Sequence, residues 1–454
     1  MPRVAPLPAP IADVVQAEMR RLDVPGVAAG VVAGGQWYAG GFGLTHTGRP
    51  SPVTPDTLFQ VGSTSKTLCA TAVMMLAEAG KLDIEQPVRA YIPSFQLRSD
   101  ADAGRVTLRH LLTHHGGWMG DYFKDMGRGD DALALMVAKM VDAPQIAPAG
   151  YAFSYSNAGF NVLARIVEIV SGEGFEAFVQ SRIFEPLEMD HSAYFADEAI
   201  VRSVAHGHFA TPAGPVPAER WAIARSIAGS SGVVSSVIDQ LRYASFHMGD
   251  GQAAAGERLL RSETLVGMRT PQAAAGSMCE SIGLSWMLDT VAGERLVKHG
   301  GSINGQLSSF EFMPGLGYAC TVLTNCDSGR EVRSTVAEAC LAHFTGIERT
   351  LPALDATLAA GAGEYAGEYR QRLFDLKVEA RDGGLTIHER TPERMREFIA
   401  ASEPPPFSAA LISPGRAVVL DGARRGETCE FLRDESGTVA WMRWDGRLSR
   451  KTAP

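Results

Sequence analysis

The pattern of predicted secondary structure changes once along the chain, and this change constrains the fold more than any other feature. Up to about residue 345, predicted helices and strands are mixed, whereas after 362 short strand-like runs follow one another with Gly-containing turns between several of them. The segment 346–361 is rich in small residues and weakly periodic, as in a linker or linker helix. At about 150 residues per domain, 454 residues correspond to two or three domains. We predict a first domain over 1–345, a linker over 346–361 and a second domain over 362–454.

The first part has strands near both of its ends and mostly helical sequence between them. Two apolar runs, 27–33 and 37–44, predict a β-hairpin, and two more strands are predicted at 305–313 and 317–325. Apolar residues at helical spacing predict helices over 11–22, 63–80, 107–115, 157–171, 236–248 and about 329–344. The predicted fold class is therefore α/β (α+β), with distant strands joined in one antiparallel sheet.

The second part has the pattern of a small all-β domain. Strands are predicted at 364–369, 373–379, 384–388, 407–412, 416–420, 428–433 and 438–443. Their short lengths and the glycines between them are typical of a barrel or sandwich of about 100 residues.

Composition disfavours several classes of protein. Hydrophobic residues make up 45% of the chain, as in ordinary globular domains, and the net charge of −9 argues against a nucleic-acid partner. The longest uncharged stretch, 143–164, is interrupted by proline and glycine, so we expect no membrane span. No secretory signal is recognisable, so we expect a cytoplasmic protein, or a periplasmic one if the sequence is a mature form. The six scattered cysteines predict buried thiols, and we expect no metal or other cofactor.

Lysine is scarce, which makes one lysine conspicuous. Of the seven lysines, only Lys66 has a serine, Ser63, three residues before it. A helix is predicted to begin there, and residues i and i+3 lie on one helix face, so the amine can reach the hydroxyl. A lysine in a water-poor site can have its pKa lowered enough to act as the base that a serine nucleophile needs. The alternative is that Ser63 caps the helix and Lys66 is solvated.

Two further motifs carry reactive side chains. Tyr155-Ser156-Asn157 is the only Tyr-x-Asn in the chain. A phenol beside a lysine can relay a proton, and an amide can hold the lysine, although Ser156 or Asn157 could also serve only as a helix cap. In His299-Gly300-Gly301-Ser302, the glycines allow a close approach to a strand, and the histidine could supply a proton or a positive charge.

These three motifs, in this order, resemble those of the serine β-lactamase and penicillin-binding-protein superfamily. The similarity is greatest to the class C-like branch, the β-lactamase-related esterases and D-aminopeptidases of peptidase family S12. The flanking sequences that also resemble the family are Phe59-Gln60-Val61-Gly62, Leu111-Leu112-Thr113-His114, Pro186-Leu187-Glu188-Met189 and Asn304-Gly305. The resemblance covers about 10–345, and the sequence from Glu364 to Tyr369 resembles the lipocalin-like barrels appended to some members.

The resemblance implies a β-lactamase/transpeptidase-like domain that transfers acyl groups through an acyl-Ser63 intermediate. Lys66 and Tyr155 would share proton transfer, and which of them is the base in each step stays open. The backbone N–H groups of Ser63 and Ser302 would form the oxyanion hole. The site residues that we predict are Ser63, Lys66, Tyr155 and His299 for catalysis and Asn157, Gly300, Gly301 and Ser302 for substrate binding.

One departure from the family pattern bears on the substrate. Many members have a lysine at the first position of the third motif, where it meets a substrate carboxylate, and here His299 stands in its place. Lys298 lies one residue earlier, where a strand would turn its side chain to the opposite face. We therefore expect amide, short-peptide or ester substrates rather than strong β-lactamase activity, with a D-aminopeptidase or amidase first and a carboxylesterase second.

Alternatives of other kinds stay open. The chain could be a catalytically inactive binding module of the same fold, and a homo-oligomer is compatible with the sequence. His206-x-His208 could place two imidazoles on one face of a strand, but no third metal ligand is evident. We expect His114 and His115 to cap and pack the helix 107–115, and Cys69 to lie in the core.

Overall fold

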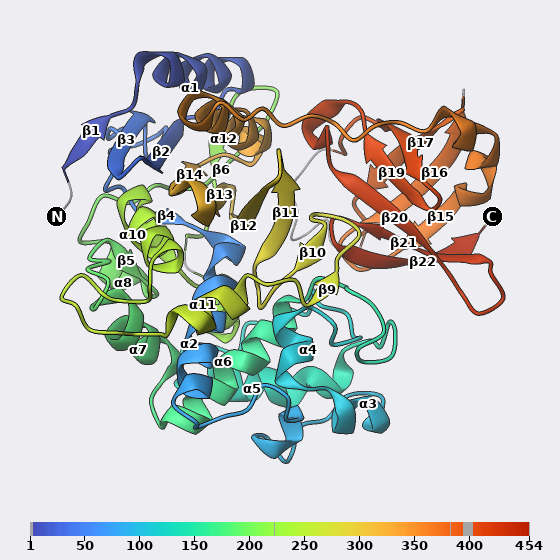
Figure 1. Cartoon of the computed structure of the whole chain (residues 1–454), viewed down its shortest axis with the longest axis horizontal. Helices are drawn as coiled ribbons and strands as arrows, with labels where there is room; N and C mark the ends of the chain where they lie inside the picture. The colour runs from blue at the N-terminus through green and yellow to red at the C-terminus, as the bar shows by residue number, and fades with distance from the viewer. Residues whose placement is uncertain (1–2, 222, 382, 394–402, 454) are drawn as a thin grey trace.

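The computed structural model describes residues 3–221, 223–381, 383–393 and 403–453. It consists of a large mixed sheet with helices on both faces and, beside it, a closed barrel built from the C-terminal residues (Figure 1). This is the predicted combination of a β-lactamase-like α/β domain and a C-terminal all-β domain.

The large sheet has nine strands, and it brings together the two ends of the first domain. In spatial order the strands are β1 (Val4–Pro6), β3 (Gln36–Gly43), β2 (Gly26–Ala33), β14 (Tyr318–Thr324), β13 (Gln306–Met313), β12 (Glu294–Ile303), β11 (Met287–Val291), β10 (Ser281–Ile282) and β9 (Ala273–Ala274). The hairpin β2–β3 joins the later strands because β2 pairs with β14, with Ala29 opposite Val322. All pairs are antiparallel except β1 with β3, so the expectation of a purely antiparallel sheet was wrong at this edge.

Strand β2 shows why helices cover both faces of the sheet. Its sequence is almost wholly apolar, and every residue from Gly26 to Val32 is buried. Val27 and Val31 belong to the core cluster with α1 and α12, whereas Ala28 and Val32 belong to the cluster with α2 and α10. Alternate side chains of a strand point to opposite faces, so a strand covered on both sides must be apolar throughout.

The helices divide between the two faces of the sheet. Helices α1 (Ala9–Leu22) and α12 (Arg330–Thr345) pack together on one face (Figure 1). On the other side lie α2 (Ser65–Glu78), α3 (Asp100–Arg105), α4 (Leu108–Leu112), α5 (Ala132–Ala138), α6 (Asn157–Ser171), α7 (Phe175–Val179), α9 (Ala228–Ser231), α10 (Val237–Met248) and α11 (Ser262–Met268). Helix α2 is buried on nearly all sides, between α6, α7 and α9, and so carries the first motif into the interior.

Smaller elements complete the first domain. They are the three-stranded sheet of β4 (Phe59–Gln60), β8 (Val234–Ser235) and β5 (Ser192–Ala193), the pair β6 (His208–Phe209) and β7 (Val216–Pro217), and the short helix α8 (Ala196–Ala199). Strand β4 leads directly into the first motif, so its pairing with β8 fixes the entry to α2.

The C-terminal strands close into an eight-stranded antiparallel barrel. The strands are β15 (Gly367–Arg370), β16 (Asp375–Arg381), β17 (Gly384–Arg390), β18 (Phe407–Ser413), β19 (Arg416–Val419), β20 (Thr428–Arg433), β21 (Val439–Trp444) and β22 (Arg447–Ala453). Alternate apolar residues such as Leu376 and Val378 point into its core. The sequence predicts seven of these strands but not β22, which closes the barrel by pairing with β15.

The barrel is reached through a connection without regular strand structure. Residues 346–355 contain no helix or strand, and a 3-10 helix, Ala356–Tyr365, leads into β15. The predicted domain limits, 1–345 and 362–454, stay a prediction. Within the described ranges, no helix combines the length and the apolar character needed to cross a membrane.

The β21–β22 hairpin of the barrel rests on the chain segment that precedes α6. The Tyr155 backbone nitrogen donates to the Gly446 carbonyl oxygen over 2.8 Å, and the Arg443 Nε donates to the Phe153 carbonyl oxygen over 3.0 Å. The Gly446 nitrogen in turn donates to Ser277 Oγ. The barrel is thus attached to the backbone of the second motif.

Candidate active site

Ser63 lies in a 3-10 turn, Gly62–Thr64, that runs directly into α2. The turn requires glycine at position 62, where φ is +53° and a side-chain carbon would come 2.8 Å from the Ser302 nitrogen. The backbone before Ser63 can therefore approach strand β12 closely. This approach brings the first and third motifs together.

Lys66 is fully buried one helical turn after Ser63, with hydrogen-bond partners from three elements. Its Nζ lies 3.0 Å from Ser63 Oγ, 2.5 Å from Asn157 Oδ1 and 2.9 Å from the Ser230 carbonyl oxygen in α9. Burial, and next the charge of Arg447, hold the pKa of Lys66 well below its ordinary value, while Asp121 opposes them. The alternative of a solvated Lys66 does not fit this environment.

Tyr155 places its ring beside the lysine and its hydroxyl beside the serine. The ring centroid lies 4.9 Å from Lys66 Nζ, and the hydroxyl lies near enough to Ser63 for the serine to affect its pKa. Burial raises the pKa of Tyr155 above its usual range, although the contact with Ser63 opposes the shift. The phenol is therefore protonated at neutral pH and can donate a hydrogen bond. The His114 ring stacks on the Tyr155 ring, with ring centroids 4.4 Å apart.

Asn157 begins α6, and Ser156 caps the helix by accepting from the Gly159 nitrogen. The capping alternative is thus true for Ser156, and it leaves the Asn157 side chain free to turn toward Lys66. Asn157 accepts from Lys66 at Oδ1 and donates from Nδ2 to Asp121 Oδ1 over 2.7 Å. A carboxylate oxygen can only accept hydrogen bonds, so the Asn157 NH₂ group must face Asp121. The amide oxygen of Asn157 therefore faces the lysine.

His299, the first residue of the third motif, lies on β12 with its ring almost completely buried. Its Nδ1 is 2.7 Å from the Gly300 carbonyl oxygen, which can only accept, so Nδ1 carries the proton. Burial, and then the charge of Lys66, lower the pKa of His299 to about 3. Of the two options that the sequence left open, a proton or a positive charge, this low pKa favours a neutral ring. Among the described residues its Nε2 has no hydrogen-bond partner.

Glycine at position 301 lets β12 meet the backbone of the first motif. A side-chain carbon on Gly301 would lie 1.9 Å from the Val61 carbonyl oxygen and 2.8 Å from the Ser63 nitrogen, whereas one on Gly300 would meet nothing nearer than 3.2 Å. Ser302 follows, and its backbone nitrogen lies against Gly62. The backbones that are predicted to form the oxyanion hole are therefore adjacent.

Lys298 does not replace the missing family lysine. Its Nζ forms an ion pair with Asp289 Oδ2 on the neighbouring strand β11, at 2.5 Å. Lys298 also lines the cleft that His299 lines, but its ammonium is taken up by this ion pair, and the expectation that the two side chains point to different sides stays a prediction.

The structure adds two side chains that the motifs do not contain. Asp121 is bound to Asn157, and Arg447 of β22 binds Asp121 with its Nε 2.6 Å from Oδ2. The Arg447 guanidinium also lies 4.9 Å from the centroid of the Tyr155 ring. Asp121 stands in a stretch without a motif, and Arg447 comes from the other domain, so no short-range pattern indicates either residue.

The remaining histidine and cysteine candidates bind backbone groups or pack in the core. His206 contacts the Ala218 carbonyl oxygen, and His208 lies between the Thr47 nitrogen and the Asn325 carbonyl oxygen. Within the described residues, no group of three or more His, Cys, Asp and Glu side chains is arranged to hold a metal ion. Cys69 is buried in the core, as predicted.

A cleft of about 810 Å³ opens over these residues. Ser63, Tyr155, Asn157, His299 and Arg447 all line it, so both domains form its walls. Further arginines lie along it, namely Arg330, Arg333, Arg349 and Arg424. Most of these arginines are paired with carboxylates that line the same cleft, Arg330 and Arg424 with Glu427 and Arg349 with Glu311. The cleft therefore offers a reactive serine and an imidazole beside a wall of ion pairs.

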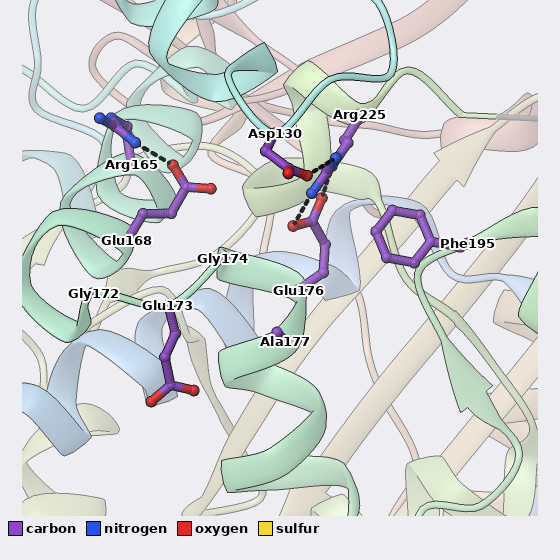
Figure 2. Close-up of a pocket in the computed structure, with 10 residues that line it drawn as sticks. All are labelled: Asp130, Arg165, Glu168, Gly172, Glu173, Gly174, Glu176, Ala177, Phe195 and Arg225. Atoms are coloured by element: carbon purple, nitrogen blue, oxygen red, sulfur yellow. Dashed lines mark hydrogen bonds and ion pairs between the residues drawn. The ribbon is translucent and has the colours of Figure 1, made fainter.

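A second hollow, of about 450 Å³, lies on the helical side of the first domain (Figure 2). Its charges are mostly paired: Arg165 with Glu168, and Arg225 with both Asp130 and Glu176. Figure 2 shows Arg225 directed at both of these carboxylates. The serine–lysine pair, by contrast, lies in the larger cleft, and we place the candidate active site there.

The sheet, the contact of the cleft-lining Ser63 with the buried Lys66, and the neighbouring Tyr155 define a serine hydrolase of the β-lactamase and penicillin-binding-protein type. The family model described as Beta-lactamase matches residues 11–342, and the chain belongs to this family. Penicillin-binding protein 4 of Amycolatopsis lactamdurans is 35% identical over 311 residues, which are 66% of this chain and 81% of that protein. The unguisins hydrolase of Aspergillus campestris is 26% identical over 70% of this chain, and the match spans 62% of its own length.

Solved structures show the same fold. The crystal structure of SurE with D-Leu superposes with a TM-score of 0.74 at 25% identity, over 98% of this chain and 99% of that one. The octameric penicillin-binding protein homologue from Pyrococcus abyssi gives 0.66 at 22% identity, over 98% of both chains. A class C beta lactamase from Rhodobacter sphaeroides gives 0.62 at 22% identity and covers 73% of this chain.

Proposed function

We propose that the protein cleaves amide or peptide bonds of small substrates through an acyl-Ser63 intermediate, in the manner of a D-aminopeptidase or amidase. The observation that carries this proposal is the contact of 3.0 Å between Lys66 Nζ and Ser63 Oγ inside a buried site. A neutral amine has two N–H groups and one lone pair. Asn157 Oδ1 and the Ser230 carbonyl oxygen accept the two N–H groups, which leaves the lone pair for the Ser63 proton.

The reaction would follow from this geometry in two halves. Ser63 Oγ attacks the substrate carbonyl carbon while its proton moves to the neutral Lys66 amine, either directly or through the Tyr155 hydroxyl, which accepts the serine proton as it passes its own proton to the lysine. The backbone N–H groups of Ser63 and Ser302 would receive the oxyanion. The proton then passes to the leaving amine or alkoxide as its bond to carbon breaks. A water molecule then attacks the carbonyl carbon of the acyl-Ser63 ester. Its proton is taken up by the same groups and returned to Ser63 Oγ as the acyl group leaves.

The third motif supports an uncharged or amine-bearing group at its side of the cleft. His299 Nε2 carries a lone pair and can accept a hydrogen bond from a substrate N–H, whereas a protonated lysine can only donate. A carboxylate would meet another acceptor at this point. This difference favours an amide or peptide over a β-lactam with its carboxylate.

One of the similar structures supports a substrate that contains a D-configured amino acid. SurE has been crystallised with D-Leu, and the Aspergillus campestris relative is named a hydrolase of unguisins. We include self-association in the proposal, because the Pyrococcus abyssi homologue is octameric.

A carboxylesterase is the second candidate, since the same serine and lysine can attack an ester, whose leaving group departs more easily. The test compares p-nitrophenyl butyrate, D-Ala-p-nitroanilide, L-Ala-p-nitroanilide and nitrocefin, each with wild type and with Ser63→Ala. We expect Ser63-dependent hydrolysis of D-Ala-p-nitroanilide to exceed that of nitrocefin. Turnover of the butyrate ester alone would support the esterase, and nitrocefin as the best substrate would contradict both candidates.

A further inference from the structure

Arg447, at the first position of β22, reaches out of the barrel into the candidate active site. Its guanidinium binds Asp121 through two contacts, Nε to Oδ2 at 2.6 Å and Nη2 to Oδ1 at 3.1 Å. The Asp121 side chain is only 2% exposed and that of Arg447 13%, so little of the ion pair meets solvent although both residues line the cleft. A planar guanidinium that binds both oxygens of a carboxylate also fixes the orientation of the carboxylate.

The same carboxylate orients the amide that holds the lysine. Asp121 Oδ1 accepts from Asn157 Nδ2 over 2.7 Å, and Asn157 Oδ1 accepts from Lys66 Nζ over 2.5 Å. An amide that rotated by half a turn would present N–H groups to the lysine. Because a carboxylate can only accept, Asp121 prevents this rotation, and the two contacts from Arg447 hold Asp121 in place.

Arg447 and Asp121 also act as a compensated pair of charges beside the proton-transfer groups. The Arg447 charge lowers the pKa values of Lys66 and Tyr155, and the Asp121 charge raises both. Asp445, in the turn before β22, holds the guanidinium from the other side through its Oδ2 at 3.0 Å. Removal of Arg447 leaves the buried Asp121 without this cation, whereas removal of Asp121 leaves Arg447 with Asp445 as its remaining carboxylate.

We propose that Arg447 is a positioning residue of the active site, which acts through Asp121 and Asn157 on Lys66, and that the barrel thereby completes the catalytic machinery. This inference rests on the proposed Ser63 chemistry. It assigns the second domain a part in the acyl-transfer step rather than only a place beside the cleft. The anchor is the hydrogen bond between the Tyr155 nitrogen and the Gly446 carbonyl oxygen, which fixes the hairpin next to the site.

The groups that share this environment come from several elements. Those that face Lys66 are Ser63 and Cys69 on its own turn and helix, Tyr155 and Asn157 at the start of α6, His114 and Asp121 from the preceding loops, His299 from β12 and Arg447 from the barrel. Burial lowers the pKa of His114 and of His299 far below neutrality. Asp121 and Arg447 are therefore the charged groups whose removal changes the field at Lys66 between pH 6 and 9.

The test measures the rate at which a small fluorophosphonate labels Ser63 in the full chain, as a function of pH. This probe carries no carboxylate, so a residue that only binds a substrate carboxylate does not affect it. For Arg447→Met we expect labelling at pH 7 to be at least tenfold slower and the acidic limb of the profile to move to higher pH. For Asp121→Asn we expect the limb to move to lower pH, because the opposite charge is lost.

Three further variants make the result specific. The double variant Arg447→Met with Asp121→Asn should return the limb close to its wild-type pH, since both charges are absent. Arg447→Lys should recover the position of the limb but only part of the rate, because one ammonium cannot hold both carboxylate oxygens. Arg433→Met, an exposed barrel arginine paired with Glu364, should label like wild type.

The outcomes separate this inference from the proposed function. Absence of labelling in the wild type contradicts the proposed function itself. Wild-type labelling rates and profiles in both Arg447→Met and Asp121→Asn overturn the positioning role, and so does an effect on the KM of a peptide substrate alone. If circular dichroism shows that Arg447→Met does not fold, Asp121→Asn and Arg447→Lys test the positioning role instead. The inference then requires a limb at lower pH in Asp121→Asn, and a limb at the wild-type pH with a reduced rate in Arg447→Lys.

Discussion

The α-carbon of Gly301 lies against the backbone of Ser63, so closely that a side-chain carbon on Gly301 would stand 2.8 Å from the Ser63 nitrogen. The Val61 carbonyl oxygen, at 1.9 Å from the same point, leaves still less room. These two neighbours are backbone atoms of a 3-10 turn and of the residue that precedes it, so they cannot move aside as a flexible side chain can. The position of the nucleophile is therefore coupled to strand β12.

Gly301→Ala is expected to lower kcat for the best substrate by at least about 10²-fold, because displacement of reacting groups by about 1 Å has effects of this size. Gly300→Ala is the matched control, since its nearest neighbour is the Ser308 carbonyl oxygen at 3.2 Å. We expect a much smaller loss there. Equal losses in the two variants, or none in either, would show that the close approach does not position Ser63.

Removal of the proton-transfer groups should abolish most activity. Lys66→Ala and Tyr155→Phe are each expected to reduce kcat/KM on the order of 10²-fold or more, as for other general acid–base residues. Lys139→Ala, on the exposed turn after α5, is the control and should behave like wild type. Activity that survives in both Lys66→Ala and Tyr155→Phe would mean that the proton follows another route.

Substitution of the third motif should change the preferred substrate. In His299→Lys the acceptor is replaced by a donor of the kind that the family uses toward carboxylates. We expect kcat/KM for nitrocefin to rise at least about tenfold relative to that for D-Ala-p-nitroanilide, which corresponds to about 1.4 kcal/mol of transition-state binding. His299→Gln, which keeps an acceptor without a charge, should preserve the wild-type order. Nitrocefin turnover that is equally raised in both variants would contradict the proposed role of charge.

Stability should decline in acid because of buried neutral histidines. Burial, and then the charge of Arg269, lower the pKa of His247 to about 3, whereas an unfolded histidine titrates near 6.5. Above pH 6.5 the ring is neutral in both states and nothing is lost. As the pH falls from about 6.5 toward 3, only the unfolded chain takes up the proton, so the free energy of unfolding falls by about 1.4 kcal/mol per pH unit for each such proton.

Urea unfolding at pH 7 and pH 5, followed by tryptophan fluorescence, measures this loss. In His247→Gln the decline should be shallower by about one proton. The ring packs on Trp286 and Tyr243, so the variant is expected to be less stable at both pH values. The test therefore lies in the slope, and an unchanged slope would contradict a neutral His247.

The sequence predicts the elements of the first domain well because their signals are local. Residues 157–171 are apolar on one face and end at Gly172, and the structure has the helix over Asn157–Ser171. The hairpin at 27–33 and 37–44 forms β2 and β3. The parallel strand β1 was not predicted, because Val4–Pro6 is short and contains proline, and only its pairing with β3 makes it a strand.

The barrel shows where a local signal was present but weak. Strand β22 reads Arg-Leu-Ser-Arg-Lys-Thr-Ala, with three charged residues, so its sequence does not have the alternating apolar pattern. The preceding Asp445-Gly446, with both residues at positive φ, is a hairpin turn of a common type and could have indicated the strand. The role proposed for Arg447 depends on contact with Asp121, 326 residues away, which no pattern along the chain encodes.

The candidate site likewise has a part that could be predicted from the sequence and a part that could not. The motifs identify Ser63, Lys66, Tyr155 and Asn157, and the structure brings these four side chains together. The protonation of His299 could not be predicted, because it depends on burial and on the nearby Lys66 charge, which belong to the tertiary structure.

The most direct test of the account is peptide mapping by mass spectrometry after reaction with a fluorophosphonate, in wild type and in Ser63→Ala. The account predicts one adduct per chain, located on Ser63, and none in the variant. A folded wild-type protein that forms no adduct, or an adduct on another residue that persists in Ser63→Ala, would contradict it.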